Sequence, residues 1–187
     1  RSRCARSCGT GRSTARRWSA GILDPTNQRV GYNSLRVTAG TSATTTATRG
    51  DVTFDFSGHS ASDTFLLAYY VNNTFTSAIR LRFATDASNY YQFTVTAPGV
   101  GYNISSLTKG SATVNGVPTW SNITSIQLDV VSNAGGSATV DFDALRIEDV
   151  DPYNPDYVLV AREALPTALE KLPGKPQEIE FSMAVSI

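Results

Sequence analysis

The stretch SNITSIQLDVVSNAGGSATVDFDALRIE, residues 121–148, decides the fold that the sequence predicts. In its first half, Ile126, Leu128 and Val130 alternate with polar residues, which is the period-two pattern of a half-buried strand. Its second half repeats this alternation. The segment NAGG at 133–136 lies between the halves and supplies residues that tolerate the positive φ of a tight turn. We therefore expect a β-hairpin here.

The rest of the chain up to this hairpin indicates more short strands, spaced roughly 10–14 residues apart, with no helical pattern between them. The predicted strands are residues 31–37, 41–48, 52–56, 64–71, 79–83, 90–95 and 100–107, followed by the two of the hairpin. Regular short strands separated by turn residues are typical of sandwiches and jelly rolls. We expect an all-β, antiparallel β-sandwich of the jelly-roll type with about eight or nine strands.

Three parts are expected along the chain: a basic leader at 1–21, the jelly-roll sandwich at 22–149, and a linker with a C-terminal extension at 150–187. Residues 1–17 contain six arginines and no acid, so the leader could bind nucleic acid or an acidic partner. The alternative is a disordered leader without such a role, and we favour that interpretation.

Composition excludes several function classes. Charged residues are only 17% of the chain, and residues 18–187 carry ten basic against sixteen acidic groups, a net charge of −6 that argues against a nucleic-acid surface on the folded body. No apolar run is long enough to span a membrane. Cys4, Cys8 and the single His59 are too few for a zinc site, and no cofactor is expected.

Two carboxylates, Asp141 and Asp143, lie two positions apart in a predicted strand and should share one face. A glycosidase would need a second acidic group across a cleft, which the sequence does not indicate. We expect a solvated face, with a structural Ca²⁺ at Asp143 as the alternative. No nucleophile has a partner and no phosphate loop is present, so no enzyme activity is predicted.

Aromatic and basic residues suggest a binding surface. Consecutive tyrosines in a strand must send one ring outward, and exposed rings beside arginines could stack on a sugar and hydrogen-bond its hydroxyls. The candidate ligand-binding residues are Tyr90, Tyr91, Trp120, Arg80 and Arg82. The alternative for these rings is ordinary packing at sheet faces or subunit contacts.

The final segment alternates Ile179, Phe181, Met183 and Val185 with polar residues, which predicts a terminal strand. A segment of this length cannot bury a core alone. We expect it to add a strand to the sandwich or to another subunit, with these four side chains forming the seam.

Residues 34–37, SLRV, and 140–147, VDFDALRI, resemble the first and last strands of galactose-binding-like jelly rolls, which are common among carbohydrate-binding domains. This resemblance covers roughly residues 30–148. It implies a glycan-binding body.

The C-terminal segment resembles the closing segments of tailed-bacteriophage structural proteins, on the residues 155–162, PDYVLVAR, together with Lys171, Gly174, Lys175 and 178–181, EIEF. That resemblance implies a non-enzymatic component of a virion, of the tail, fibre or head-decoration type. It also implies assembly with other copies of the chain and with other virion proteins, and we expect contact with cell-surface glycans through the jelly roll. The alternatives are a carbohydrate-binding module of a secreted bacterial enzyme and a cement protein without a ligand.

Overall fold

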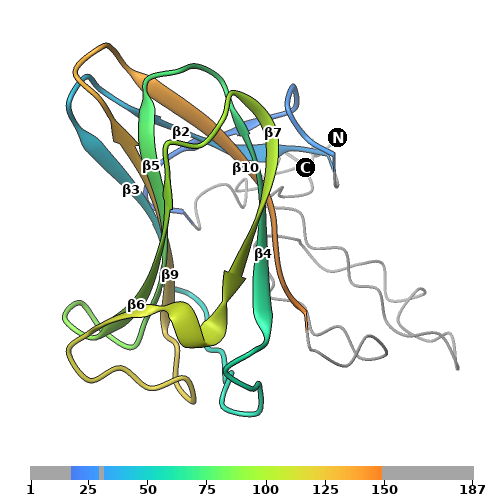
Figure 1. Ribbon diagram of the computed structural model, residues 1–187, viewed down its shortest axis with the longest axis vertical. Helices are drawn as coiled ribbons and strands as arrows, with labels where there is room; N and C mark the ends of the chain where they lie inside the picture. Colours follow the sequence, from blue (N-terminus) through green and yellow to red (C-terminus); the bar gives the residue numbers. More distant parts are fainter. Residues whose placement is uncertain (1–17, 30–31, 149–187) are drawn as a thin grey trace, which may run out of the picture.

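The computed structural model describes residues 18–29 and 32–148, which form ten β-strands in two facing layers (Figure 1). Sheet B contains, in spatial order, β1 (Ile22–Asp24), β2 (Ser34–Ala39), β10 (Ala138–Glu148), β4 (Thr64–Val71) and β7 (Gly101–Thr108). Sheet A contains β3 (Thr44–Arg49), β9 (Ser125–Ser132), β5 (Thr76–Ala84), β6 (Tyr90–Thr96) and β8 (Thr113–Asn115). All neighbouring strands are antiparallel, so the predicted all-β antiparallel sandwich is confirmed.

The strand order is that of a jelly roll. The order β2-β10-β4-β7 in one layer faces β3-β9-β5-β6 in the other, and the chain crosses between the layers after β2, β3, β4, β6, β7 and β9. The strands β1 and β8, of three residues each, extend one edge of each sheet. The sequence did not predict these two strands, because three residues are too few for an alternating pattern to stand out. Within the described residues the one helical element is a 3-10 turn, η2 (Lys109–Ser111).

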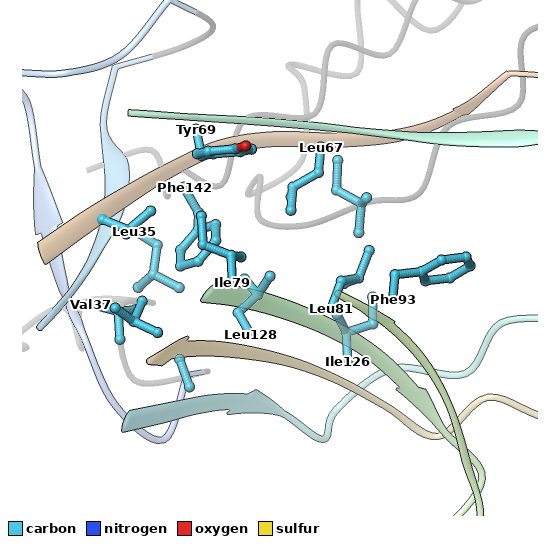
Figure 2. Close-up of a cluster of buried hydrophobic side chains, with 14 of the residues drawn as sticks. Leu35, Val37, Leu67, Tyr69, Ile79, Leu81, Phe93, Ile126, Leu128 and Phe142 are labelled. Carbon is cyan, nitrogen blue, oxygen red and sulfur yellow. The ribbon is translucent and has the colours of Figure 1, made fainter. Parts of the chain in front are cut away.

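The core fills the space between the sheets, with side chains from both layers pointing toward each other (Figure 2). On the inner side of β4, Phe65, Leu67 and Tyr69 are at most 2% exposed, and on the inner side of β5, Ile79 and Leu81 are at most 1% exposed. Each fully buried side chain of this size stabilises the fold by about 1.5–3 kcal/mol relative to an exposed one. The alternate residues of these strands face outward, and the candidate site is built from them.

The strands β9 and β10 do not pair with each other, so the hairpin prediction for residues 121–148 is wrong. The strand β9 lies between β3 and β5, whereas β10 lies between β2 and β4 in the other layer. Their inner residues, such as Leu128 and Phe142, therefore face each other across the core. The connection crosses between layers around the ring of Phe75, where a Cβ on Gly136 would lie 2.8 Å from ring carbons. Glycine is required there for close approach, not for a two-residue hairpin turn.

Residues 52–56 were expected to form a strand, and the structure has a loop there instead. Phe54 makes a single antiparallel bridge with Ile123, and Phe56 is 4% exposed. The alternating apolar side chains of this loop close one end of the core between β3 and β4. Alternation therefore reflects burial here without indicating a sheet ladder.

The packed region begins earlier than predicted. Trp18 is 5% exposed in the core and forms a bridge with Arg49, and the backbone N–H of Ser19 donates to the carbonyl of Thr48 at 2.9 Å. Residues 18–21 thus belong to the sandwich and not to a leader. The rest of the predicted leader, residues 1–17, and the segment 149–187 with its assembly residues lie outside the described residues.

In the part of the chain that the structure describes, no helix has the length and apolar character needed to cross a membrane.

Candidate functional site

The outer side of sheet A carries a polar surface that we call the arginine face, after Arg80 and Arg82 of β5. Both arginines face outward because their neighbours along the strand, Ile79 and Leu81, are buried in the core. The register aligns the outward residues of four strands in rows: Thr46, Asp129, Arg80, Thr94; then Thr48, Gln127, Arg82, Gln92; then Ser125, Ala84, Tyr90. Three of the five predicted ligand-binding residues, Arg80, Arg82 and Tyr90, therefore share this face.

The sheet that carries the arginine face is bent. In Figure 2, β5 and β9 curve so that the core side chains stand on the convex side, with Ile79, Leu81 and Leu128 pointing toward the other sheet.

Asp129 is the centre of the electrostatics of this face. Its side chain is 1% exposed, and its Oδ1 accepts a hydrogen bond from Thr46 Oγ1 at 2.8 Å. Its Oδ2 lies 2.8 Å from Arg82 Nη2 and 3.7 Å from Arg80 Nη1. This Oδ2 accepts no hydrogen bond of good geometry from the described residues, so the two contacts are ion pairs by distance alone. Two guanidinium groups share one carboxylate, which leaves one positive charge uncompensated on the face.

Arg82 is held in place by several neighbours. Its Nε donates to Gln92 Oε1 at 2.8 Å, and its Nη1 donates to Gln127 Oε1 at 3.3 Å. Its guanidinium carbon lies 5.1 Å from the centroid of the Tyr90 ring, within the range of a cation–π contact. Arg82 therefore orients Tyr90 and anchors Asp129, so the face is preorganised.

Arg80 has fewer bonded partners than Arg82. Its side chain is 33% exposed, against 19% for Arg82. The 3.7 Å approach to Asp129 is its one ion pair within the described part of the chain, where it makes no hydrogen bond. A guanidinium has five N–H donors in a planar fork, so Arg80 presents most of its hydrogen-bonding capacity to solvent.

The other two predicted ligand-binding residues, Tyr91 and Trp120, lie elsewhere. Their rings stack on each other with centroids 3.8 Å apart and planes 4° apart, and the Tyr91 hydroxyl donates to the carbonyl of Pro118. Trp120 also packs near Phe65 and Phe83 at the end of the core. Burial raises the pKa of the Tyr91 hydroxyl. These rings use each other's faces in packing, and the structure does not bring them together with Tyr90.

The outer side of sheet B carries a similar ion pair, but that pair is covered. Asp141 is 0% exposed, and both of its carboxylate oxygens bind Arg36, through Nε at 2.7 Å and Nη2 at 3.1 Å. The amides of Asn27 and Asn72 donate to Oδ2 at 2.7 and 2.8 Å. The expectation of a solvated face is wrong here, because the connection between β1 and β2 lies over the carboxylate.

Asp143 lies beside this pair at a β-bulge and is 1% exposed. Its Oδ2 accepts a hydrogen bond from the backbone N–H of Arg29 at 2.9 Å. The described residues contain no group of three or more His, Cys, Asp or Glu side chains that could hold a metal. The calcium site at Asp143 stays a prediction. Both aspartates bind the β1–β2 connection, which is a structural use of their charge.

The same connection is fixed by Asp24, which forms an ion pair with Arg36. Burial by itself raises the pKa of Asp24, but hydrogen bonds from Thr26 and the charge of Arg36 outweigh burial and lower that pKa below its usual value. The hydrogen bond to Asp141 is the main reason that the pKa of Arg36 is raised. Asp24 and Arg36 therefore stay charged at neutral pH, and the donors and acceptors of the cluster are directed at one another.

A third polar group lies at the end of the sandwich near Trp120. The Lys109 ammonium donates to the carbonyls of Phe56, at 2.7 Å, and His59, and it lies 5.4 Å from the Trp120 ring centroid. Burial is the main cause that lowers the pKa of Lys109. His59 Nδ1 lies 3.2 Å from Asp63 Oδ2. These contacts tie the 54–63 loop to η2 and serve its packing.

Sequence reasoning missed Asp129, Thr46, Gln92 and Gln127 as members of the arginine face. Each is an ordinary polar residue in its own strand, and only the strand pairing places it beside an arginine. A usable signal was present in the first half of 121–148: an aspartate facing outward from a strand whose outward neighbours are uncharged. Because the sequence does not show that β9 pairs with β5, this aspartate could not be placed beside Arg80 and Arg82.

No family model and no curated protein matches this chain significantly. Among solved structures, PfGH50B matches 75% of the chain at 12% identity with a TM-score of 0.46, and the match spans 22% of PfGH50B. A family 16 carbohydrate-binding module matches 70% at 8% identity with a TM-score of 0.40, spanning 89% of the module. The glycoside hydrolase domain of Endo-D (Spr0440) from Streptococcus pneumoniae R6 matches 68% at 14% identity with a TM-score of 0.34, spanning 20% of that chain.

The chain therefore spans only about a fifth of the two longer proteins that it resembles. Nothing in these matches points to a bacteriophage protein, so the virion location, like the assembly role of Ile179, Phe181, Met183 and Val185, stays a prediction.

Proposed function

We propose that this sandwich is a non-enzymatic glycan-binding domain and that the arginine face is its binding surface. The observation that carries the proposal is the combination of Tyr90, Arg80 and Arg82 on one sheet face, surrounded by hydroxyl and amide side chains. Sugar recognition needs an apolar ring face for stacking and several donors and acceptors for hydroxyl groups. Both needs are met within one sheet.

The Tyr90 ring is the stacking platform in this proposal. Its position is set by Arg82 at 5.1 Å on one face of the ring. The ring is half-buried, so it loses little rotational freedom on binding, and the face away from Arg82 receives the sugar. Gln92 then contacts hydroxyl groups of the same sugar unit, and Arg80 contacts the next unit.

The test is to measure binding of soluble polysaccharides by affinity electrophoresis and isothermal titration calorimetry for the wild type and Tyr90→Ala. Removal of one stacking ring should weaken binding by about threefold to tenfold. Tyr32→Ala is the matched control, because Tyr32 is 68% exposed and belongs to the β1–β2 connection over sheet B. Equal loss in both variants, or binding unaffected by Tyr90→Ala, would show that sugars do not bind this face.

A second candidate function is assembly with other copies of the chain, favoured by the exposed edge of sheet B. The strand β7 has one partner strand among the described residues, and on this edge Ile104 is 67% exposed and Val100 is 54% exposed. An edge strand with apolar side chains is a surface to which another strand adds. The seam residues would come from the 156–187 segment, and the virion setting rests on its sequence resemblance alone.

Light scattering of the full chain and of a chain that lacks 156–187 tests this second candidate. An oligomer that becomes a monomer on truncation supports it. An unchanged mass would contradict it.

A further inference from the structure

The charged residues of the arginine face bear on which kind of glycan this face would bind, which deepens the proposed function. The strands β3, β5, β6, β8 and β9 alternate, so their outward positions can be read from the register. At these positions Arg80, Arg82 and Asp129 are the charged residues, and the others are hydroxyl, amide, aromatic or small apolar residues. The face thus has two positive charges and one negative charge, whereas residues 18–187 as a whole carry a net negative charge.

The surplus charge belongs to Arg80 and not to Arg82. Arg82 makes the 2.8 Å contact with Asp129 and donates to two glutamines. Arg80 reaches the same carboxylate at 3.7 Å, beyond hydrogen-bond distance. Asp129 is therefore neutralised chiefly by Arg82, and the Arg80 guanidinium keeps both its charge and its donors for another partner.

The surroundings of Arg80 suit an anionic partner. Thr94 lies directly opposite Arg80 on β6 and is exposed, so its hydroxyl can donate to an oxygen bound at the guanidinium. A fork of guanidinium donors matches the paired oxygens of a carboxylate or a sulfate ester. No carboxylate other than Asp129 faces outward from these strands to repel such a group.

Arg80 is also placed at a useful distance from the stacking ring. Tyr90 lies opposite Ala84, four residues along β5 from Arg80, which corresponds to roughly 13 Å at the rise of a β-strand. A sugar stacked on Tyr90 cannot itself reach Arg80. A neighbouring unit of the same polysaccharide chain can do so, and its charged group would fix the register of the chain on the face.

We infer that the ligand of the arginine face is an anionic polysaccharide, one whose sugar units carry carboxylate or sulfate groups, and that Arg80 binds one of these groups. This inference rests on the proposed function. It makes Arg80 the residue that discriminates charged from neutral glycans, while Tyr90 contributes to the binding of both.

The experiment compares matched probes that differ in charge. Polygalacturonate and its methyl-esterified, neutral form test carboxylate, and κ-carrageenan and agarose test sulfate. Affinities are measured by calorimetry for the wild type, Arg80→Gln and a control, Arg146→Gln. Arg146 is an outward-facing arginine of sheet B, 46% exposed and paired with Glu148, so its removal changes the net charge equally without touching the arginine face.

The wild type should bind at least one anionic probe more tightly than its neutral counterpart. Arg80→Gln should weaken that binding by about tenfold to a hundredfold, as expected for a lost charge-assisted hydrogen bond, and leave neutral probes unchanged. Arg146→Gln should have little effect. Added salt should reduce the wild-type preference and not the residual binding of Arg80→Gln.

The outcomes separate the two proposals. Equal or tighter Tyr90-dependent binding of neutral probes would overturn the inference about charge and leave glycan binding intact. Anionic binding that Arg80→Gln and Arg146→Gln weaken equally would also overturn it, because the net charge would then be the cause. If no probe binds in a manner that Tyr90→Ala weakens, the proposed function itself fails.

Discussion

The two outer faces of the sandwich carry the same pair of residues in opposite settings. On sheet B, Arg36 of β2 binds Asp141 of β10, and the β1–β2 connection covers the pair with Asn27. On sheet A, Arg82 of β5 lies against Asp129 of β9, and its other side-chain partners, Gln92 and Gln127, belong to the same sheet. Both carboxylates are buried, with side chains 0% exposed for Asp141 and 1% exposed for Asp129. The two arginines have different neighbours. Arg36 also forms an ion pair with Asp24, whereas Arg82 shares its carboxylate with a second cation, Arg80.

This difference distinguishes an ion pair that stabilises the fold from an ion pair that positions a charged group for binding. Where a loop supplies further acceptors and donors, every charge is matched and the pair fixes the loop. Where the face is left open and the cations outnumber the acids, the pair positions a charged group for a partner in solution. Three substitutions test that distinction.

The largest expected effect is on the covered face. Asp141→Asn should destabilise the protein by about 3 kcal/mol. The Arg36 guanidinium loses its bidentate carboxylate, and the new amide group has one acceptor oxygen fewer for Arg36, Asn27 and Asn72, which all donate to this side chain. The measurement is the free energy of unfolding in urea at neutral pH. A loss below about 1 kcal/mol would mean that the covered pair does not hold the β1–β2 connection in place.

A smaller loss of stability is expected on the open face. Asp129→Asn should reduce the free energy of unfolding by about 1–2 kcal/mol, because Asp129 accepts one side-chain hydrogen bond of good geometry, from Thr46, whereas Asp141 accepts four. The same urea titration serves as the measurement. If Asp129→Asn destabilised the protein as much as Asp141→Asn, the contrast between a structural and a binding pair would be lost.

The smallest expected effect concerns pH and the covered face. The folded state lowers the pKa of Asp24, so its carboxylate stabilises the fold above its unfolded pKa of about 3.9, and this contribution is lost as pH falls through the lower folded value. Asp24→Asn should therefore be less stable than the wild type at pH 7, and the difference should shrink toward pH 2. A difference that is the same at both pH values would assign the effect to packing and not to charge.

Residue alternation predicted the layers well and the pairing poorly. The runs at 64–71 and 79–83 became β4 and β5 with their inner residues in the core, as expected. The two runs of 121–148 also became strands, yet they lie in different layers, because alternation marks the buried face of a strand without naming its neighbour. The glycine-rich link is compatible with a hairpin turn and with a crossing between layers. In the structure it crosses between layers, and its glycines pack closely against the ring of Phe75.

The candidate site was predictable to the same extent. Alternation along 79–83 implies that Arg80 and Arg82 share a face, and the structure agrees. Alternation of Tyr91, Phe93 and Val95 with Gln92 and Thr94 likewise places Tyr90 on the outward side and Tyr91 on the inward side, and the buried Phe93 agrees. Asp129 remained hidden because its relation to Arg80 depends on a register between segments about fifty residues apart.

The crossing between β9 and β10 has a consequence for how quickly the chain can reach its native state. Strands that are adjacent in sequence form a ladder soon after a short turn closes, but β10 must find Ala39 and Val71, far earlier in the chain, before it gains a single sheet hydrogen bond. Loops of that length close slowly, and folding times of milliseconds to seconds are typical when such distant pairings dominate. The last described strand, which lies between β2 and β4, thus completes sheet B only after β1 to β9 have been synthesised.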